Sequence, residues 1–328
     1  MLYKNSILEK ENFSVEIDLI KDLQDISKQR LKSMGYQIDE KVNEDWIRLY
    51  FNAQKRLISN TPRTVVKSKE FQCPDKFLPA LQEIEDCFTK GKSIVPYMTT
   101  HIIYSKEKDL LLYDWGIYHL HLGLKDPKER FAERSDQELF VFIKETVAYF
   151  IQTYPHTKKH LYATQEMIKI LHDNWPEIIE DRRIVGVTGA TGFTDKEYDE
   201  IRKSGGSVLL DVGNGDVYGL LGGGYASNGS SLEVTRNADY WKRIMRAYQK
   251  TIIAEANNII KGIYKLTNIE AIRDLKIKMI HLNDDEISLF EGSNNVCLQM
   301  YRNETFYRIC YPQDLFKEQE NYKWIKMR

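Results

Sequence analysis

The stretch ELFVFIKETVAYFIQTYPH, from Glu138 to His156, predicts the centre of the fold. Its phenylalanine, valine, tyrosine and isoleucine residues favour strands over helix. A polar break near Glu145 divides the stretch, so we expect two strands joined by a short turn. The sequence therefore predicts a small antiparallel sheet in the middle of the chain.

The segments before this sheet have the apolar spacing of helices. The spacing is seen within residues 19–26, 43–59 and 75–90. Gly91 is placed to end the last of these helices. The basic link of residues 60–74 is predicted to be irregular, and Pro96 is expected to begin or edge a strand.

The segments after the sheet mix helix and strand signals. Residues 164–179 are typical of a helix that Pro176 ends. The capping-box pair Thr194 and Glu197 begins another helix. Further along we expect a hairpin turn at Asn214-Gly215, a long helix over 241–263, and an antiparallel meander over 276–312 with turns at Asn283, Gly292 and Asn303.

The predicted elements come in the order of helices, then a sheet, then a part that mixes both. This order indicates an α+β fold rather than an α/β fold in which strands and helices alternate. We expect three consecutive regions. They are a helical N-terminal region over 1–92, a central small antiparallel sheet with a helix over 93–182, and a C-terminal α+β region over 183–328.

The composition excludes several classes of protein. The chain has 328 residues and a net charge of −1, so no overall positive field attracts nucleic acid. No apolar run is long enough for a transmembrane span, and the first residues lack the apolar core of a signal peptide. The four cysteines are far apart, which favours reduced thiols in a cytoplasmic protein over a zinc site.

The stretch DWGIYHLHLG, Asp114–Gly123, carries two histidines one residue apart and precedes the central strands. Successive side chains of a strand point to opposite faces. Tyr118 and Leu120 therefore share one face, which is apolar, and His119 and His121 share the other. If the apolar face rests on a core, both imidazoles are expected on the open face of the sheet.

Histidines are concentrated around this strand, since six of the seven lie in the central region. Consecutive antiparallel strands bring the start of one near the end of the next. We therefore expect Arg134 and His156 to lie near one another and near the histidine strand. The six histidines are His101, His119, His121, His156, His160 and His172.

These residue types suit proton transfer at a phosphodiester. Imidazole titrates near neutral pH, and arginine can hold a phosphate through two hydrogen bonds. RNA cleavage without a metal needs one group that deprotonates the 2′-hydroxyl, one that protonates the departing 5′-oxygen, and a cation. Two other interpretations stay open: histidines that only pack or hydrogen-bond, and a metal site of His119 and His121 with His156 or His160.

The histidine segment resembles the DWGIHHLHL-type signature of a bacterial family, with Tyr118 in place of a further histidine. The strand order is similar to that of the small ribonuclease toxins of the RelE and ParE superfamily. There an arginine precedes one strand and a histidine or tyrosine follows the next. The corresponding positions here are Arg134, Leu139–Phe142, Tyr154 and His156. The resemblance implies a metal-independent endoribonuclease of toxin or phage-defence type.

The sequence thus predicts a cytoplasmic hydrolase that cleaves RNA by acid–base catalysis and needs no cofactor. His119 and His121 are the expected proton carriers. Arg134 is the expected phosphate holder, and His156 is an auxiliary acid or base. Expected substrate contacts are Tyr154, Lys158 and Lys159, although the two lysines equally suit a solvated turn. RNA and an antitoxin or other regulatory protein are the expected partners. A non-catalytic binding module and a metal-dependent hydrolase are the alternatives.

Two glycine-rich segments have less specific signals. Residues 185–193 are similar to the nucleotide-binding turn of short-chain dehydrogenases, but Asp195 stands where a third glycine is expected. We interpret them as a loop. Residues 219–231 are interpreted as a wide turn, with an anion-binding nest or a lid as the alternatives.

Overall fold

The structure is a computed structural model, and it has the α+β fold that the sequence predicts, with a helical N-terminal region. It describes residues 14–39, 42–187, 192–213, 215–269, 274–283, 285–301, 306–315 and 325–326. The tight turn expected at Asn214, the turn expected at Asn303 and part of the glycine-rich segment 185–193 lie outside the described residues.

The chain divides into two compact units. Unit 1 comprises Met1–Arg30, Lys41–Ile47 and Ala238–Arg328, and unit 2 comprises Leu31–Glu40 and Arg48–Asn237. This division does not follow the three consecutive regions expected. The physical reason is that β1 (Ser14–Ile17) pairs in parallel with β8 (Asp274–Leu282), which makes the N-terminal segment part of the C-terminal sheet.

Unit 2 contains a four-stranded sheet in the order β2-β5-β4-β3. Its strands are β2 (Thr64–Lys67), β3 (Ile117–His121), β4 (Gln137–Ile143) and β5 (Val147–Pro155). Neighbours are antiparallel except β2, which pairs in parallel with β5. The β4–β5 hairpin is the one predicted from the central stretch. In contrast, β2 lies in the link expected to be irregular, where Val65 and Val66 suit a strand.

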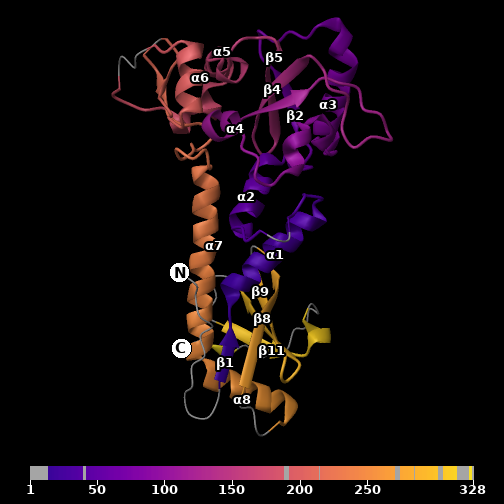
Figure 1. Cartoon of the computed structure of the whole chain (residues 1–328), viewed down its shortest axis with the longest axis vertical. Coiled ribbons are helices and arrows are strands. Elements are labelled where there is room, and N and C mark those ends of the chain that lie inside the picture. The colour runs from indigo at the N-terminus through magenta and orange to yellow at the C-terminus, as the bar shows by residue number, and fades with distance from the viewer. Residues whose placement is uncertain are drawn as a thin grey trace. The chain divides into compact units, whose positions relative to one another are not determined.

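Both faces of this sheet are covered, because its central strands are apolar on both sides. Residues Gln137–Phe142 of β4 are all buried. Leu120 belongs to a core with residues of α3 (Leu78–Lys90), and Ile117 belongs to another with residues of α5 (Glu166–Asn174). Figure 1 shows α3 and α5 on opposite sides of these strands.

Other elements of unit 2 are short. They are α4 (Leu110–Trp115), α6 (Asp195–Lys203), the β6–β7 pair (Leu210–Asp211 and Val217–Tyr218), and most of α2 (Trp46–Arg56). The capping box of α6 is present, with the Thr194 amide donating to Glu197 at 2.8 Å. The strand expected at Pro96 is wrong, because Val95–Tyr97 form a 3-10 turn whose proline occupies an early helical position.

Unit 1 contains a sheet in the order β1-β8-β9-β10-β11-β12. Its further strands are β9 (Glu286–Glu291), β10 (Val296–Tyr301), β11 (Phe306–Cys310) and β12 (Ile325–Lys326). The predicted meander is confirmed by the antiparallel pairing of β8 to β11. The helices of this unit are α8 (Ala256–Thr267) and parts of α1 (Leu19–Ser33) and α7 (Leu232–Ala254). The long helix expected over 241–263 is thus two helices that meet at Glu255.

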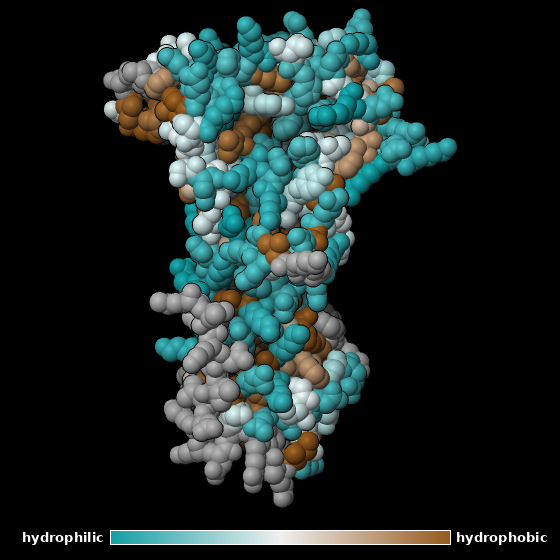
Figure 2. Space-filling model, in the orientation of Figure 1, coloured by the Kyte–Doolittle hydropathy of each residue, from teal (hydrophilic) through white to brown (hydrophobic). Residues whose placement is uncertain are grey.

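All four cysteines are free, and burial raises the pKa of the Cys297 thiol to about 11, which suits the inert thiols expected. Within the described ranges, no helix combines the length and apolar character that a bilayer span requires. Hydrophilic residues cover most of the visible face of unit 2, with only small hydrophobic areas between them (Figure 2).

Candidate functional site

Asp114, Trp115 and Gly116 together position the histidine strand. Asp114 and Trp115 end α4 and are completely buried. Gly116 follows with a φ of 72°, a left-handed conformation that glycine adopts without strain. The chain turns there from α4 into β3. The DWG triplet is therefore a helix-to-strand turn.

A buried ion pair holds this turn. Nη2 and Nε of Arg202, on α6, lie 2.8 Å and 3.1 Å from Oδ2 of Asp114. Burial raises the pKa of the Asp114 carboxyl, and the charge and hydrogen bonds of Arg202 oppose that rise. The Arg202 guanidinium also lies 4.3 Å from the centroid of the Trp115 ring. Helix α6 is thereby tied to the start of β3.

His119 and His121 share the sheet face of Ile117, which belongs to the core beneath α5. Their side chains are only 15% and 9% exposed. The expectation of an open face is therefore wrong, because alternate residues of β3 enter two different cores. The two imidazoles also have different surroundings. His119 is opposite Phe140 on β4, whereas His121 is opposite Glu138.

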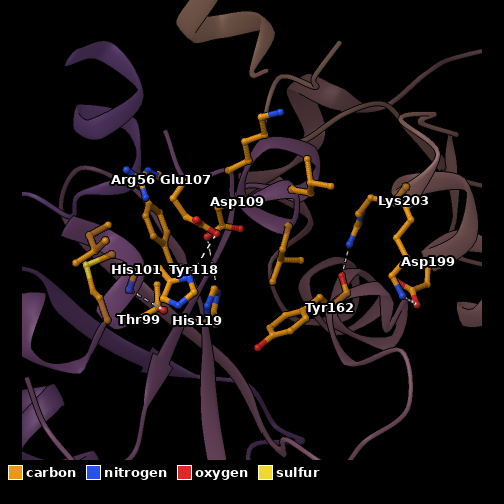
Figure 3. A pocket seen from close by; sticks show the side chains of 16 residues that line it. Arg56, Thr99, His101, Glu107, Asp109, Tyr118, His119, Tyr162, Asp199 and Lys203 are labelled. Atoms are coloured by element: carbon orange, nitrogen blue, oxygen red, sulfur yellow. Dashed lines mark hydrogen bonds and ion pairs between the residues drawn. The ribbon is translucent and has the colours of Figure 1, made fainter. Parts of the chain in front are cut away.

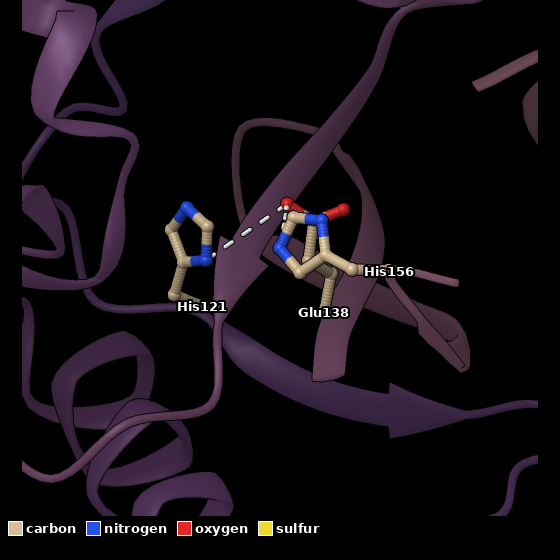
Figure 4. Close-up of side chains that lie close together, drawn as sticks. All are labelled: His121, Glu138 and His156. Carbon is tan, nitrogen blue, oxygen red and sulfur yellow. Dashed lines mark ion pairs between the residues drawn. The ribbon is translucent and has the colours of Figure 1, made fainter. Parts of the chain in front are cut away.

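His121, Glu138 and His156 form a compact cluster (Figure 4). Nε2 of His156 lies 3.2 Å from Oε1 of Glu138, and Nδ1 of His121 lies 3.9 Å from the same oxygen. The two imidazole rings are stacked, with centroids 5.4 Å apart. The strand register and the end of β5 thus bring two predicted histidines to one carboxylate.

Exposure increases across the cluster. The Glu138 side chain is fully buried, His121 is nearly so, and the His156 side chain is 34% exposed. The Tyr162 hydroxyl donates to Oε1 of Glu138 at 3.2 Å. Among the residues that the structure describes, Oε2 of Glu138 and Nδ1 of His121 are buried and have no hydrogen-bond partner, and such atoms are few in proteins. His156 is the most exposed member of the cluster.

The surroundings of His121 keep it neutral. Burial lowers its pKa to about 4, and the charges of His119, His156 and Arg134 act in the same direction. A neutral imidazole at pH 7 can accept a proton or bind a metal. Arg134 itself is exposed, two residues before Asp136 and outside the sheet. Its charge acts on His121, and the placement of Arg134 beside the cluster stays a prediction.

His119 lines a cavity of about 340 Å³ instead of joining the cluster (Figure 3). Its Nδ1 lies 3.8 Å from Oδ2 of Asp109, and its ring lies 5.2 Å from that of Tyr162. Figure 3 shows Arg56, Asp109 and His119 on one side of this space and Tyr162 and Lys203 on the other. Tyr162 therefore contacts both the cavity and Glu138.

The expected substrate contacts are partly engaged within the protein. The Tyr154 hydroxyl donates to Glu166 at 2.8 Å, and Nζ of Lys158 lies 4.0 Å from the centroid of the Tyr154 ring. Lys158 also forms an ion pair with Glu166 at 3.4 Å. Lys159 is exposed on the turn after β5. Of the three, Lys159 is the side chain most available to a ligand.

The remaining predicted histidines have separate contacts. Nδ1 of His160 lies 2.8 Å from Asp199, so His160 is not part of the cluster that includes His156. Nδ1 of His172 lies 2.8 Å from the Tyr218 hydroxyl. His101 lines the cavity, 3.7 Å from Glu107. The group of histidines is therefore divided between the cluster, the cavity and two structural contacts.

Glu138 and Tyr162 are functional candidates that sequence reasoning missed. Glu138 is fully buried within a run of buried residues in β4. A carboxylate in an otherwise apolar strand is an available signal, because charged groups are rarely buried without a partner. Tyr162 follows β5 after a turn and has no such signal.

The cluster also has the composition of a metal site. The ligand atoms of His121, Glu138 and His156 all lie within 4.8 Å of one another. Two imidazoles and one carboxylate suit Zn²⁺ or Fe²⁺. The expected ligand pair of His119 and His121 is not brought together here. Comparisons of the chain with protein-family models, with curated proteins and with solved structures found no match.

Proposed function

We propose that the cluster of His121, Glu138 and His156 cleaves RNA by metal-independent acid–base catalysis, with Arg134 beside it. The observation that carries the proposal is the 3.2 Å contact between Nε2 of the half-exposed His156 and the buried Glu138 carboxylate. A buried carboxylate fixes the orientation of an imidazole and compensates the charge it gains on protonation.

Each group has a role that follows from its surroundings. His121 is neutral at pH 7 and accepts the proton of the 2′-hydroxyl. The 2′-oxygen attacks the phosphorus, and the bond to the 5′-oxygen breaks. His156 donates a proton to that leaving oxygen, while Glu138 compensates the charge of its imidazolium. Arg134 neutralises the extra negative charge of the phosphorane. No proton-transfer role falls to His119, because it lies in the cavity.

RNA is the substrate that fits these groups best, because the 2′-hydroxyl supplies an internal nucleophile. The reaction then needs only two proton carriers and a cation. The products are a 2′,3′-cyclic phosphate and a 5′-hydroxyl. Uncontrolled RNA cleavage would harm the cell that makes the protein, which is why an antitoxin stays part of the proposal.

The test is cleavage of a short RNA by the purified full chain in EDTA, with the products identified by mass spectrometry. His156→Ala is expected to lower the rate by about 10²–10⁴-fold, the usual loss on removal of a general acid or base. His281→Ala, a histidine of β8 in unit 1, is the matched control. Intact RNA after incubation with wild-type protein, together with no effect of His121→Ala in cells, would leave a non-catalytic module with structural histidines.

A metal-dependent hydrolase is the second candidate. It is favoured by the buried, unpartnered atoms Oε2 of Glu138 and Nδ1 of His121, which a bound cation would satisfy. Such a site would use His121, Glu138 and His156 as ligands. Metal analysis of the purified chain distinguishes the candidates. Stoichiometric zinc, iron or manganese with activity lost in chelator favours the hydrolase, whereas full activity in metal-free protein favours acid–base cleavage.

A further inference from the structure

The cavity that His119 lines is connected to the proposed catalytic cluster through two residues. Tyr162 lines the cavity, and its hydroxyl donates to Oε1 of Glu138 at 3.2 Å. His119 lies two residues before His121 on β3, and both side chains are on the same face of the sheet. Residues at this spacing in a strand are about 7 Å apart, a distance that one nucleotide can span. A group bound in the cavity is therefore next to a substrate bound at the cluster.

The walls of the cavity suit a flat aromatic ligand. Tyr162 is 39% exposed, and its ring lies 5.2 Å from the His119 ring. Ile102, Leu110 and Leu111 supply aliphatic parts of the lining. The volume of about 340 Å³ is at the small end of the range for ligand pockets, which suits a single nucleobase with its ribose. Exposed aromatic side chains are the groups on which the bases of single-stranded RNA stack.

Most charged groups that line the cavity already have partners within the protein. Glu107 lies 3.7 Å from His101. The cations Lys108, Arg202 and Lys203 donate to the Asn228 carbonyl, Asp114 and Asp199. The polar contacts of a ligand are therefore expected at the remaining lining groups, Asp109 and His119.

Asp109 and His119 present accessible polar atoms on one side of this cavity (Figure 3). Oδ1 of Asp109 accepts the Leu112 amide at 2.9 Å and caps α4. Oδ2 of Asp109 and Nε2 of His119 have no hydrogen-bond partner within the described ranges, and neither atom is fully buried. Nδ1 of His119 is buried 3.8 Å from Oδ2 of Asp109, and the carboxylate favours a proton on it. Nε2 then carries a lone pair, so both accessible atoms are hydrogen-bond acceptors.

We propose that the cavity binds the guanine base of the RNA nucleotide on the 5′ side of the cleaved bond, an inference that rests on the proposed function. Guanine presents two adjacent N–H donors, at N1 and N2, to the two acceptors. Adenine and cytosine present an acceptor next to a donor, and uracil presents one N–H between two carbonyls. A carboxylate therefore discriminates against all three, because it is left facing an acceptor.

The assignment to the 5′ side follows from the roles within the cluster. His121 accepts the proton of the 2′-hydroxyl, and it is the cluster residue that shares β3 with His119. The nucleotide that supplies this hydroxyl is thus the one whose base is beside the cavity. Asp109 and His119 are base-binding residues in this proposal and transfer no proton.

The experiment is calorimetric titration of the full chain with the 3′-monophosphates of guanosine, adenosine, cytidine and uridine. The ribose and the phosphate are the same in all four, so only the base differs. Guanosine 3′-monophosphate is expected to bind roughly tenfold or more tightly than the others, since a hydrogen bond to a charged group contributes about that factor. His156→Ala is expected to keep this preference, because His156 does not line the cavity.

Asp109→Asn is expected to lower the preference for guanosine by the same factor. Asparagine keeps an oxygen that caps α4, but it places an amide donor where Oδ2 accepts. Asp18→Asn is the matched control, because Oδ1 of Asp18 also accepts an amide three residues further on, that of Lys21 at 3.0 Å, and Asp18 does not line the cavity. If Asp109→Asn does not fold, Asp109→Ser replaces it, since serine also caps helices and has no carboxylate.

Cleavage of an RNA of mixed sequence in EDTA gives a second measurement. The wild type is expected to leave mainly guanosine 2′,3′-cyclic phosphate ends. Asp109→Asn is expected to leave ends of all four bases, a change in base preference that a merely structural role of Asp109 would not produce.

Two results would overturn the inference, whether or not the protein cleaves RNA. One is that the folded wild-type chain binds the four nucleotides with equal affinity, or binds none of them at millimolar concentration. The other is that a folded Asp109 variant keeps the preference for guanosine. A preference that the Asp109 variant loses, in a protein that cleaves no RNA, would refute the proposed function and leave the cavity as a guanine site.

Discussion

Replacing Arg202 by methionine leaves the Asp114 carboxylate buried without its cation. Asp114 is fully buried, and in the described part of the chain its side chain accepts two hydrogen bonds from Arg202. Removal of one partner from a buried ion pair costs about 3–5 kcal/mol. Methionine keeps much of the apolar contact with Trp115, so the lost charge dominates. We expect the free energy of unfolding at pH 8 to fall by that amount.

The loss is expected to shrink at lower pH. Burial raises the pKa of Asp114 in the folded wild type, so its contribution to stability decreases as pH rises from about 3.9 through the folded pKa. Without Arg202 the folded pKa rises further, and the folded variant takes up a proton at a pH where the wild type does not. The difference between the two proteins therefore decreases by up to about 1.4 kcal/mol per pH unit on acidification.

The assay is urea unfolding of both proteins at pH 8 and pH 6, followed by circular dichroism. Lys203→Met is the control on the same helix. Its exposed pair with Asp199 is expected to contribute less than about 1 kcal/mol. The double variant Asp114→Leu/Arg202→Met is expected to recover much of the stability. A loss in Arg202→Met that is the same at both pH values, or below about 1 kcal/mol at pH 8, would refute this reasoning.

Arg63→Met is expected to lower the free energy of unfolding by about 3 kcal/mol or more, because the Lys144 and Ser59 carbonyls lose a charged donor. Arg56→Met is expected to lower it much less, because two of the three Arg56 nitrogens have no hydrogen-bond partner among the described residues. Thermal unfolding of both variants checks this contrast, and equal losses would contradict it. Gly222→Ala is expected to destabilise by about 1–3 kcal/mol or more, because its Cβ would lie 2.1 Å from the Leu112 carbonyl oxygen. Gly192→Ala is the control and is expected to be nearly neutral in the same measurement, because a Cβ there meets no atom of the described residues within 4 Å.

Local sequence signals predicted the elements whose formation depends on local contacts. The β4–β5 hairpin, α3 with its Gly91 end, and the capped α6 are all confirmed. The strand β2 was missed because its four residues become a strand only by pairing with β5, about 80 residues further along the chain. The break at Glu255 was missed because the apolar stripe continues through it.

Only part of the candidate site was predicted, because the rest of it depends on contacts between segments that are distant in the sequence. Strand order was sufficient to place His121 and His156 near one another. The separation of His119 from His121 depends on the register with β4, which sets one against Phe140 and the other against Glu138. No periodicity within β3 contains that information. The burial of Glu138 likewise depends on two layers that close over the sheet from distant segments.

The measurement that tests the central claim most directly is the rate of RNA cleavage by Glu138→Gln in EDTA. Glutamine keeps the shape of the side chain but cannot compensate the charge of a protonated His156. The account predicts a folded variant whose rate is lower than that of the wild type by about 10²-fold or more, with the same cyclic-phosphate product. A folded Glu138→Gln variant that cleaves RNA at the wild-type rate would contradict it.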